Sequence, residues 1–300
     1  MVRRSNRNRG YITKIVVVGL FLVIVIAMLA SIYFTSNPNQ KQDIRSRASE
    51  ATSPLLSLDF NNGWNGTGGQ APTTVTGPAW LRPGPKGIGQ SAYLYNNAAL
   101  WYLSAGNINK DAGTLEFWFK PLTWNNDSTV AHRFLDVTFK CSNLSGPAGP
   151  CKNYMVLEID NSPSESTKTI WFSIDDSQTA WLGSHGKTAT AQVEIAPPYK
   201  RWYHIAVTWN KDFGSIIYVD GISVTQDNEP YSLNDPTDAA VDGSGHIIIA
   251  EASGLGPKFN VSADSIIDNY NIYGYVKDGP TIKSDYISDK SKFSAVTPTP

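Results

Sequence analysis

The sequence predicts an all-β protein: one two-sheet antiparallel sandwich of the jelly-roll type, preceded by a single N-terminal transmembrane helix. Short runs of alternating apolar and polar side chains recur along the chain between Gly, Pro, Asn and Asp, as in sheets with one buried face. The nine Trp, 14 Tyr, 11 Phe, 24 Gly and 18 Pro favour many short strands joined by turns. No amphipathic helix of ordinary length competes with these strands, so we expect strands alone beyond the N-terminal segment.

The first element is an uncharged stretch of 20 residues, Ile15 to Phe34. A helix of this length, rising 1.5 Å per residue, spans the roughly 30 Å hydrocarbon core of a bilayer. Five Lys or Arg precede the stretch and three follow it closely, and this excess favours a cytoplasmic N-terminus. We therefore expect a cytoplasmic basic segment over 1–14, a transmembrane helix over 15–34 and an extracytoplasmic remainder.

Two alternatives remain open for this segment. One is a cleaved signal peptide, although the apolar stretch exceeds the usual length of about 7 to 15 residues. In addition, Ala27 and Ala30 lie one residue too far apart for an Ala-x-Ala cleavage site. The other is a prepilin-like leader, because Arg9-Gly10-Tyr11 precedes the stretch and resembles a prepilin processing site. Pilins usually have Glu at the fifth mature position, and that position is Ile15 here.

The exported part is expected to be one domain between two polar segments. Residues 35–53 have too few apolar groups to bury surface and predict a flexible linker. The sandwich is expected over residues 54–290, and residues 291–300 as a disordered tail. Alternation predicts strands near 55–60, 91–96, 99–103, 114–120, 133–140, 153–160, 169–174, 190–195, 202–209, 215–220, 246–251 and 266–275.

Two of these strands carry large side chains on both faces. Phe117 and Phe119 alternate with Trp118, and Tyr203 and Trp209 belong to a similar run that also contains Trp202 and His204. A strand that is covered on both faces belongs in the middle of a sheet. We therefore expect both strands at the centre of the sandwich.

The charge of the exported part excludes nucleic acid as a partner. The whole chain has 25 basic and 26 acidic side chains, and residues 1–50 hold eight of the basic ones and two of the acidic ones. The remaining residues are therefore net negative. Binding to phosphate needs clustered Lys and Arg.

Four motifs follow one another in an order that is known from one superfamily. They are GTLEFWFKP at 113–121, WYHIAVTW at 202–209, IYVDG at 217–221 and IDNYNIY at 267–273. On these motifs the chain resembles the laminin G-like domains of the concanavalin A-like lectin/glucanase superfamily over about residues 54–290. The resemblance implies the sandwich fold, but that fold hosts lectins, adhesion modules and glycosidases alike.

The residues argue against a glycosidase. Retaining glucanases of this superfamily carry a strand of the form Glu-x-Asp-x-Glu or Glu-x-Asp-x-x-Glu, in which one Glu is the nucleophile and the other the acid. Glu158-Ile159-Asp160 begins this pattern, but Ser162 and Pro163 occupy the positions of the third acid. We therefore expect no enzyme activity, and we expect Glu158 and Asp160 on the solvated face of a strand.

The two cysteines, Cys141 and Cys151, bracket a loop-like segment rich in Gly and Pro. Outside the membrane an even number of cysteines predicts a disulfide, whereas two thiols at this spacing are a poor metal site. We expect a Cys141–Cys151 bridge at the base of a loop, which peptide maps with and without reductant would test.

Three Trp lie in polar, loop-like surroundings: Trp64, Trp124 and Trp181. A flat aromatic face beside Asn and Asp side chains suits the stacking of a sugar ring, so these three are candidate carbohydrate-binding residues. The alternative is that each of them covers an edge of the core.

Laminin G-like modules often bind Ca²⁺ near the first strand and near the last motif, and the resemblance implies Asp59 and Asp268 as candidate ligands here. The chain departs from the family pattern nearby, because Asn269 replaces the usual acid and Asn271 the usual Arg. Since Ca²⁺ takes six to eight oxygens, loop carbonyls and water would have to complete the shell.

Together these observations predict a membrane-anchored, extracytoplasmic recognition or adhesion module that is not an enzyme. We expect it to bind a carbohydrate or a cell-surface protein. Two alternatives remain: a structural subunit of a surface or pilus-like assembly, and a degenerate glycoside hydrolase.

Overall fold

The computed structural model describes residues 53–96, 98–122, 124, 131–138, 153–160, 167–174, 187–195, 201–228, 230–231, 245–250 and 263–294. The chain divides into two units, Met1–Thr52 and Ser53–Pro300, and all of the described residues belong to the second. The predicted transmembrane helix at 15–34 lies outside the described residues. Within them, no helix combines the length and apolar character that a bilayer span requires.

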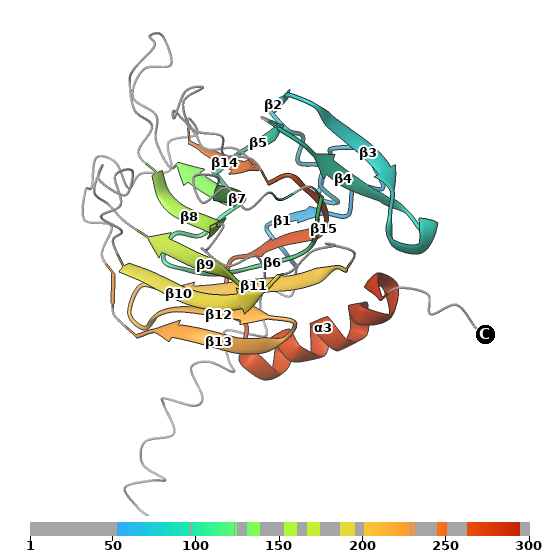
Figure 1. Ribbon diagram of the computed structural model, residues 1–300. Coiled ribbons are helices and arrows are strands. Elements are labelled where there is room, and N and C mark those ends of the chain that lie inside the picture. Colours follow the sequence, from blue (N-terminus) through green and yellow to red (C-terminus); the bar gives the residue numbers. More distant parts are fainter. Residues whose placement is uncertain are drawn as a thin grey trace, which may run out of the picture. The chain divides into compact units, whose positions relative to one another are not determined.

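The described residues form two antiparallel sheets that face each other, as the sequence predicts (Figure 1). The larger sheet has eight strands in the order β13-β12-β11-β6-β15-β4-β3, with β1 paired to β15. Its strands are β1 (Leu56–Leu58), β3 (Ala79–Pro83), β4 (Gln90–Leu94), β6 (Ala112–Pro121), β11 (Tyr203–Asn210), β12 (Gly214–Val219), β13 (Ile222–Asp227) and β15 (Ser265–Tyr273).

The smaller sheet has seven strands in the order β10-β9-β8-β7-β14-β5-β2. They are β2 (Thr74–Thr76), β5 (Ala99–Leu103), β7 (Ala131–Thr138), β8 (Asn153–Asp160), β9 (Thr167–Ile174), β10 (Lys187–Glu194) and β14 (His246–Ile249). Every strand predicted from alternation overlaps an observed one. The short strands β2, β3 and β13, which lie at sheet edges, were not predicted.

Aromatic side chains join the two sheets in one core. The ring of Phe134 on β7 lies 5.2 Å from that of Phe117 and 4.8 Å from that of Phe119, both on β6 of the larger sheet. Strands β6 and β11 pair along eight residues in the middle of the larger sheet. Their predicted central position is confirmed.

One helix, α3 (Gly279–Phe293), packs on the outer face of the larger sheet (Figure 1). This corrects the expectation of strands alone, and it places residues 291–293 in the last turn of a helix rather than in a tail. Asp278 caps the N-terminus by accepting a hydrogen bond from the Thr281 amide at 2.9 Å. The helix is held by burial of Ile282 and Phe293 against the sheet.

Candidate functional site

The structure brings together only some of the residues that the sequence singles out. Trp124 is buried, with 4% of its surface exposed, and its ring stacks on that of His132 at 4.0 Å. It therefore covers the core and presents no open face to a sugar. Trp64 is half-buried and packs edge-on against Phe60. Trp181 and the predicted pair Cys141 and Cys151 lie outside the described residues.

A different tryptophan, Trp80, is exposed to solvent. Trp80 on β3 is 44% exposed, and its ring lies 5.6 Å from that of Tyr93, its cross-strand partner on β4. The guanidinium carbon of Arg82 lies 5.9 Å from the Trp80 ring centre and 5.8 Å from that of Tyr93. We call Trp80, Arg82 and Tyr93 the aromatic platform.

Sequence reasoning missed the platform because β3 is short and lies at a sheet edge. A signal was present, however. Ala79 and Leu81 pack against the core, so the residues that alternate with them, Trp80 and Arg82, must share the outer face.

The two candidate calcium ligands do line one common pocket. Asp59 and Asp268 line a cavity of about 240 Å³ together with Asn61, Lys292 and other residues from η1 (Pro85–Gly87), its flanks and α3. Asp268 is buried, and burial raises the pKa of its carboxyl to about 6 even though Ser91 and the Asn269 amide donate hydrogen bonds to it.

The carboxylates of both acids already accept hydrogen bonds from protein groups. Asp268 accepts from Ser91 Oγ and from the Asn269 amide, each at 2.8 Å. Both oxygens of Asp59 accept hydrogen bonds from Asn61 at 3.1 Å. In the part of the chain that the structure describes, no three His, Cys, Asp or Glu gather as a metal site would require. The calcium hypothesis stays a prediction that a melting curve in Ca²⁺ and in EDTA would test.

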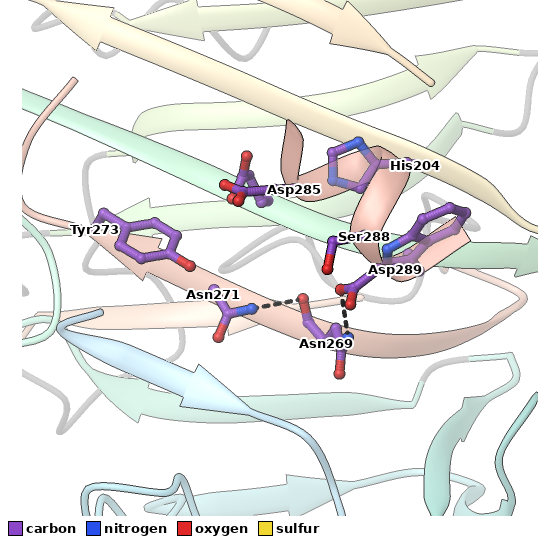
Figure 2. Close-up of a pocket in the computed structure, with 9 residues that line it drawn as sticks. His204, Asn269, Asn271, Tyr273, Asp285, Ser288 and Asp289 are labelled. Carbon is purple, nitrogen blue, oxygen red and sulfur yellow. Dashed lines mark hydrogen bonds between the residues drawn. The ribbon is translucent and has the colours of Figure 1, made fainter. Parts of the chain in front are cut away.

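A second cavity, of about 160 Å³, lies between α3 and the larger sheet (Figure 2). We call it the helix–sheet cleft. Strands β6, β11 and β15 form its floor and α3 forms its wall. The lining residues are Glu116, Trp118, His204, Asn269, Asn271, Tyr273, Asp285, Ser288 and Asp289.

Aromatic stacking fixes the wall of the cleft against its floor. The Trp118 ring stacks on Phe293 at 4.2 Å and on Tyr286 at 5.6 Å, so the two helix side chains hold the sheet residue between them. His204 lies beside them, 5.1 Å from Trp118. These contacts turn a different side of α3, with Asp285, Ser288 and Asp289, toward the cleft (Figure 2).

A buried ion pair lies at one end of the cleft. Lys277 Nζ donates to Glu116 Oε2 at 2.5 Å and to Asp285 Oδ2 at 2.9 Å, and it lies 3.5 Å from the centre of the Tyr273 ring. Burial raises the pKa of Glu116 to about 7, against the opposing effect of the Lys277 ammonium. Burial alone would lower the pKa of Lys277, but its carboxylate neighbours raise it above its ordinary value.

His204 is neutral at physiological pH. Burial, and secondarily the charge of Lys277, lower the pKa of its imidazole to about 3. The side chain is 3% exposed, and its Nδ1 has no hydrogen-bond partner among the described residues. The same holds for Oε1 of Glu116, a residue that is 5% exposed.

Glu158, the residue that begins the glucanase-like pattern, is not solvated as expected. It is 5% exposed because Arg133 binds it, with Nη2 at 2.6 Å and Nε at 2.9 Å from Oε2. Nη1 of the same arginine donates to Asp136 at 2.8 Å. The side chain of Asp160 lies outside the described residues.

The comparisons with known proteins agree with this architecture. The sequence profile of the concanavalin A-like lectin/glucanases superfamily matches residues 89–283. Among the curated proteins no match is found.

Solved structures of the same fold include binding domains of botulinum neurotoxins. The binding domain of botulinum neurotoxin DC in complex with rat synaptotagmin II matches with a TM-score of 0.53 and 14% identity, over 79% of this chain and 51% of that one. The receptor binding domain of botulinum neurotoxin type G matches at 0.51 and 16% identity, over 79% and 52%. The neurotoxin DC domain in complex with SialylT matches at 0.50 and 14%, with the same coverage. This chain thus spans about half the length of these structures.

The profile match covers more than half of the chain, and the two sheets have the strand pairing of a jelly-roll sandwich. The chain therefore belongs to the concanavalin A-like lectin/glucanase superfamily.

Proposed function

We propose that this chain is a non-catalytic recognition module that binds carbohydrate through the aromatic platform. The observation that carries the proposal is the exposed ring of Trp80 beside that of Tyr93. The C–H groups on one side of a sugar ring pack on such a flat apolar face, while the sugar hydroxyls stay in water or bond to polar neighbours.

Arg82 supports an acidic carbohydrate as the ligand. Its guanidinium lies near both rings, and a planar guanidinium binds a carboxylate with two parallel hydrogen bonds. A sugar that stacks on Trp80 would bring its substituents close to this group. We therefore propose a sialylated or uronic acid-containing glycan over a neutral one.

Known structures of this fold support a binding role in general terms. The binding domain of neurotoxin DC was solved in complex with SialylT and also in complex with synaptotagmin II, so a protein that contains this fold binds both a sugar and a protein ligand. Glu158 forms an ion pair with Arg133, and the third acid of the glucanase pattern is missing. Both observations support a role without catalysis. Anchoring by residues 15–34 remains part of the proposal, and protease treatment of intact cells would test it.

A glycan array tests the platform directly. We expect the full chain in detergent to bind acidic glycans, and Trp80→Ala to weaken this binding by about tenfold or more, the factor that corresponds to about 1.4 kcal/mol. Arg82→Gln should weaken the binding of acidic glycans more than that of their neutral parent glycans. Phe213→Ala is the matched control, because Phe213 is 72% exposed and lies away from the platform in the β11–β12 turn.

Two results would contradict the proposal. If Trp80→Ala and Phe213→Ala bind glycans equally well, the platform is not the sugar site. If the full chain binds no glycan on the array, a protein ligand is the better explanation.

A further inference from the structure

We propose that the helix–sheet cleft binds a small organic cation, a primary ammonium compound. This site is separate from the aromatic platform and does not depend on the proposed function. Three features carry the inference: buried polar atoms without partners, an excess of negative charge, and amide side chains that present acceptors to the cleft.

The first feature is the pair of unpartnered atoms on the cleft floor. Glu116 Oε1 and His204 Nδ1 belong to residues of which 5% or less is exposed, and neither atom has a hydrogen-bond partner in the described structure. A buried polar atom without a partner destabilises the fold, and a ligand that bonds to it removes this cost. Glu116 and His204 lie on neighbouring strands and face the same cavity, because Trp118, the register partner of His204, is two residues from Glu116. A ligand in this cavity therefore lies against both residues.

The second feature is the charge of the lining. Glu116, Asp285 and Asp289 contribute three carboxylates, and Lys277 is the one ammonium bonded to any of them in the described structure. Lys277 already donates hydrogen bonds to Glu116 and Asp285. His204 is neutral, so the lining keeps an excess of negative charge. Such a site repels anions and favours a cation.

The third feature is the direction of the amide side chains. Asn269 Nδ2 donates to Asp289 Oδ2 at 3.0 Å, and Asn271 Nδ2 donates to the Asn269 carbonyl oxygen at 3.0 Å (Figure 2). Each NH₂ group thus has one acceptor within the protein, and each side chain keeps its carbonyl oxygen as an acceptor for a ligand. Together with the carboxylates, these oxygens give the cleft several acceptors for a ligand that donates hydrogen bonds.

A primary ammonium group meets these requirements. It carries a positive charge and three N–H donors, and it has no acceptor atom that would face the carboxylates. A bare metal ion fits less well, since the described residues gather no set of three metal-binding side chains. The cavity volume of about 160 Å³ lies below the roughly 300–1,000 Å³ of sites for drug-sized ligands, so the ligand is small.

Calorimetric titration with ethanolamine tests the proposal, with ethylene glycol as a probe of the same size that has a hydroxyl in place of the ammonium. The full chain is used in detergent at pH 8, above the pKa of Glu116, so that this carboxyl is ionised. We expect ethanolamine to bind and ethylene glycol not to bind. Asp289→Asn should weaken ethanolamine binding by about ten- to a hundredfold, the factor for one charge-assisted hydrogen bond.

Three further variants make the result specific. Ser288→Lys places an ammonium on the exposed side of α3 that lines the cleft, and it should abolish ethanolamine binding without unfolding the helix. Asp212→Asn removes an exposed carboxylate outside the cleft and should leave the affinity unchanged. Trp80→Ala should also leave it unchanged, which separates this site from the glycan platform.

The proposal is overturned if ethanolamine and ethylene glycol bind alike, or if neither binds, because the cleft then holds only water. It is also overturned if ethanolamine binds equally well to Ser288→Lys, since the ammonium is then bound elsewhere.

Discussion

The burial of several polar or loop-like side chains in this domain depends on partners that are distant in sequence. Glu158 alternates along its strand as a solvated residue would, yet it is buried because Arg133, 25 residues earlier, binds it. Trp124 stands in a polar segment, yet its indole donates to the carbonyl oxygen of Ala263 and closes the core. Local sequence pattern shows polarity but not the tertiary partner, so the burial of Glu158 was not predicted and that of Trp124 was one of two alternatives.

By contrast, Asp59 and Asp268, which were predicted as calcium ligands, line one pocket in the structure, and calcium binding itself stays a prediction. That prediction came from a resemblance in motif order, which contains information about the whole fold. In the structure β1 pairs with β15, so that the residues just after β1 lie near those of β15. The motif order could not show that these carboxylates already have hydrogen-bond donors. Asn61 donates to Asp59, and Ser91 and the Asn269 amide donate to Asp268.

Asp268 gives a testable pH dependence of stability. Its pKa is about 6 in the folded protein, and burial is the main cause of the rise from 3.8. A carboxyl with a raised pKa binds its proton more tightly in the folded state, so it favours folding most below pH 3.8. This contribution is lost as the pH rises from about 4 to 6, and the loss amounts to about 3 kcal/mol.

We therefore expect Asp268→Asn to flatten the pH dependence of the free energy of unfolding. Urea denaturation at pH 4, 5, 6 and 7 would measure it. Between pH 4 and 7, the free energy of unfolding of the variant should increase relative to that of the parent chain by up to about 3 kcal/mol. Asp212→Asn, at an exposed site, is the control, and parallel curves for Asp268→Asn and the parent chain would contradict the assignment.

At the scale of elements, strands covered on two faces were predicted best. Strands β6 and β11 have large side chains at nearly every position, which only the centre of a sheet can bury. The edge strands β2, β3 and β13 are short and largely exposed. They have no apolar face strong enough to be recognised.

Helix α3 was not predicted because its stability comes from tertiary contacts. Its apolar side chains are few, and only Ile282 and Phe293 are fully buried. The start signals were nevertheless present, since Asp278 stands at the N-cap and Pro280 in the first turn. What holds the helix is the stacking of Tyr286 and Phe293 on Trp118, a residue that lies far away in the sequence.

The C-terminal boundary of the domain can be tested on this helix. A chain ending at residue 290, the boundary predicted from sequence, lacks Phe293, whose ring is 4% exposed and stacks at 4.2 Å on Trp118. We expect it to lose about 3–5 kcal/mol of stability, as for removal of a buried Phe side chain. A chain ending at residue 294 should match the full chain. Equal urea midpoints for the two truncated chains would show that the last turn of α3 contributes nothing.

At the scale of the whole domain, the two sheets share one hydrophobic core. Its buried residues come from both sheets, including Phe117 and Phe119 from the larger and Phe134 from the smaller. Neither sheet can keep its inner face from water without the other. The sandwich should therefore unfold as one cooperative unit, and a single core substitution should weaken both sheets together.

Phe134→Ala tests this cooperativity. The side chain is fully buried and contacts the rings of Phe117 and Phe119 across the two sheets, so we expect the variant to lose about 3–5 kcal/mol of stability. Urea transitions followed by tryptophan fluorescence and by far-ultraviolet circular dichroism should shift together, while the exposed control Phe213→Ala should change stability by less than about 0.5 kcal/mol. Two separated transitions in Phe134→Ala would mean that one sheet can persist without the other, and the shared core would then not be what holds the domain together.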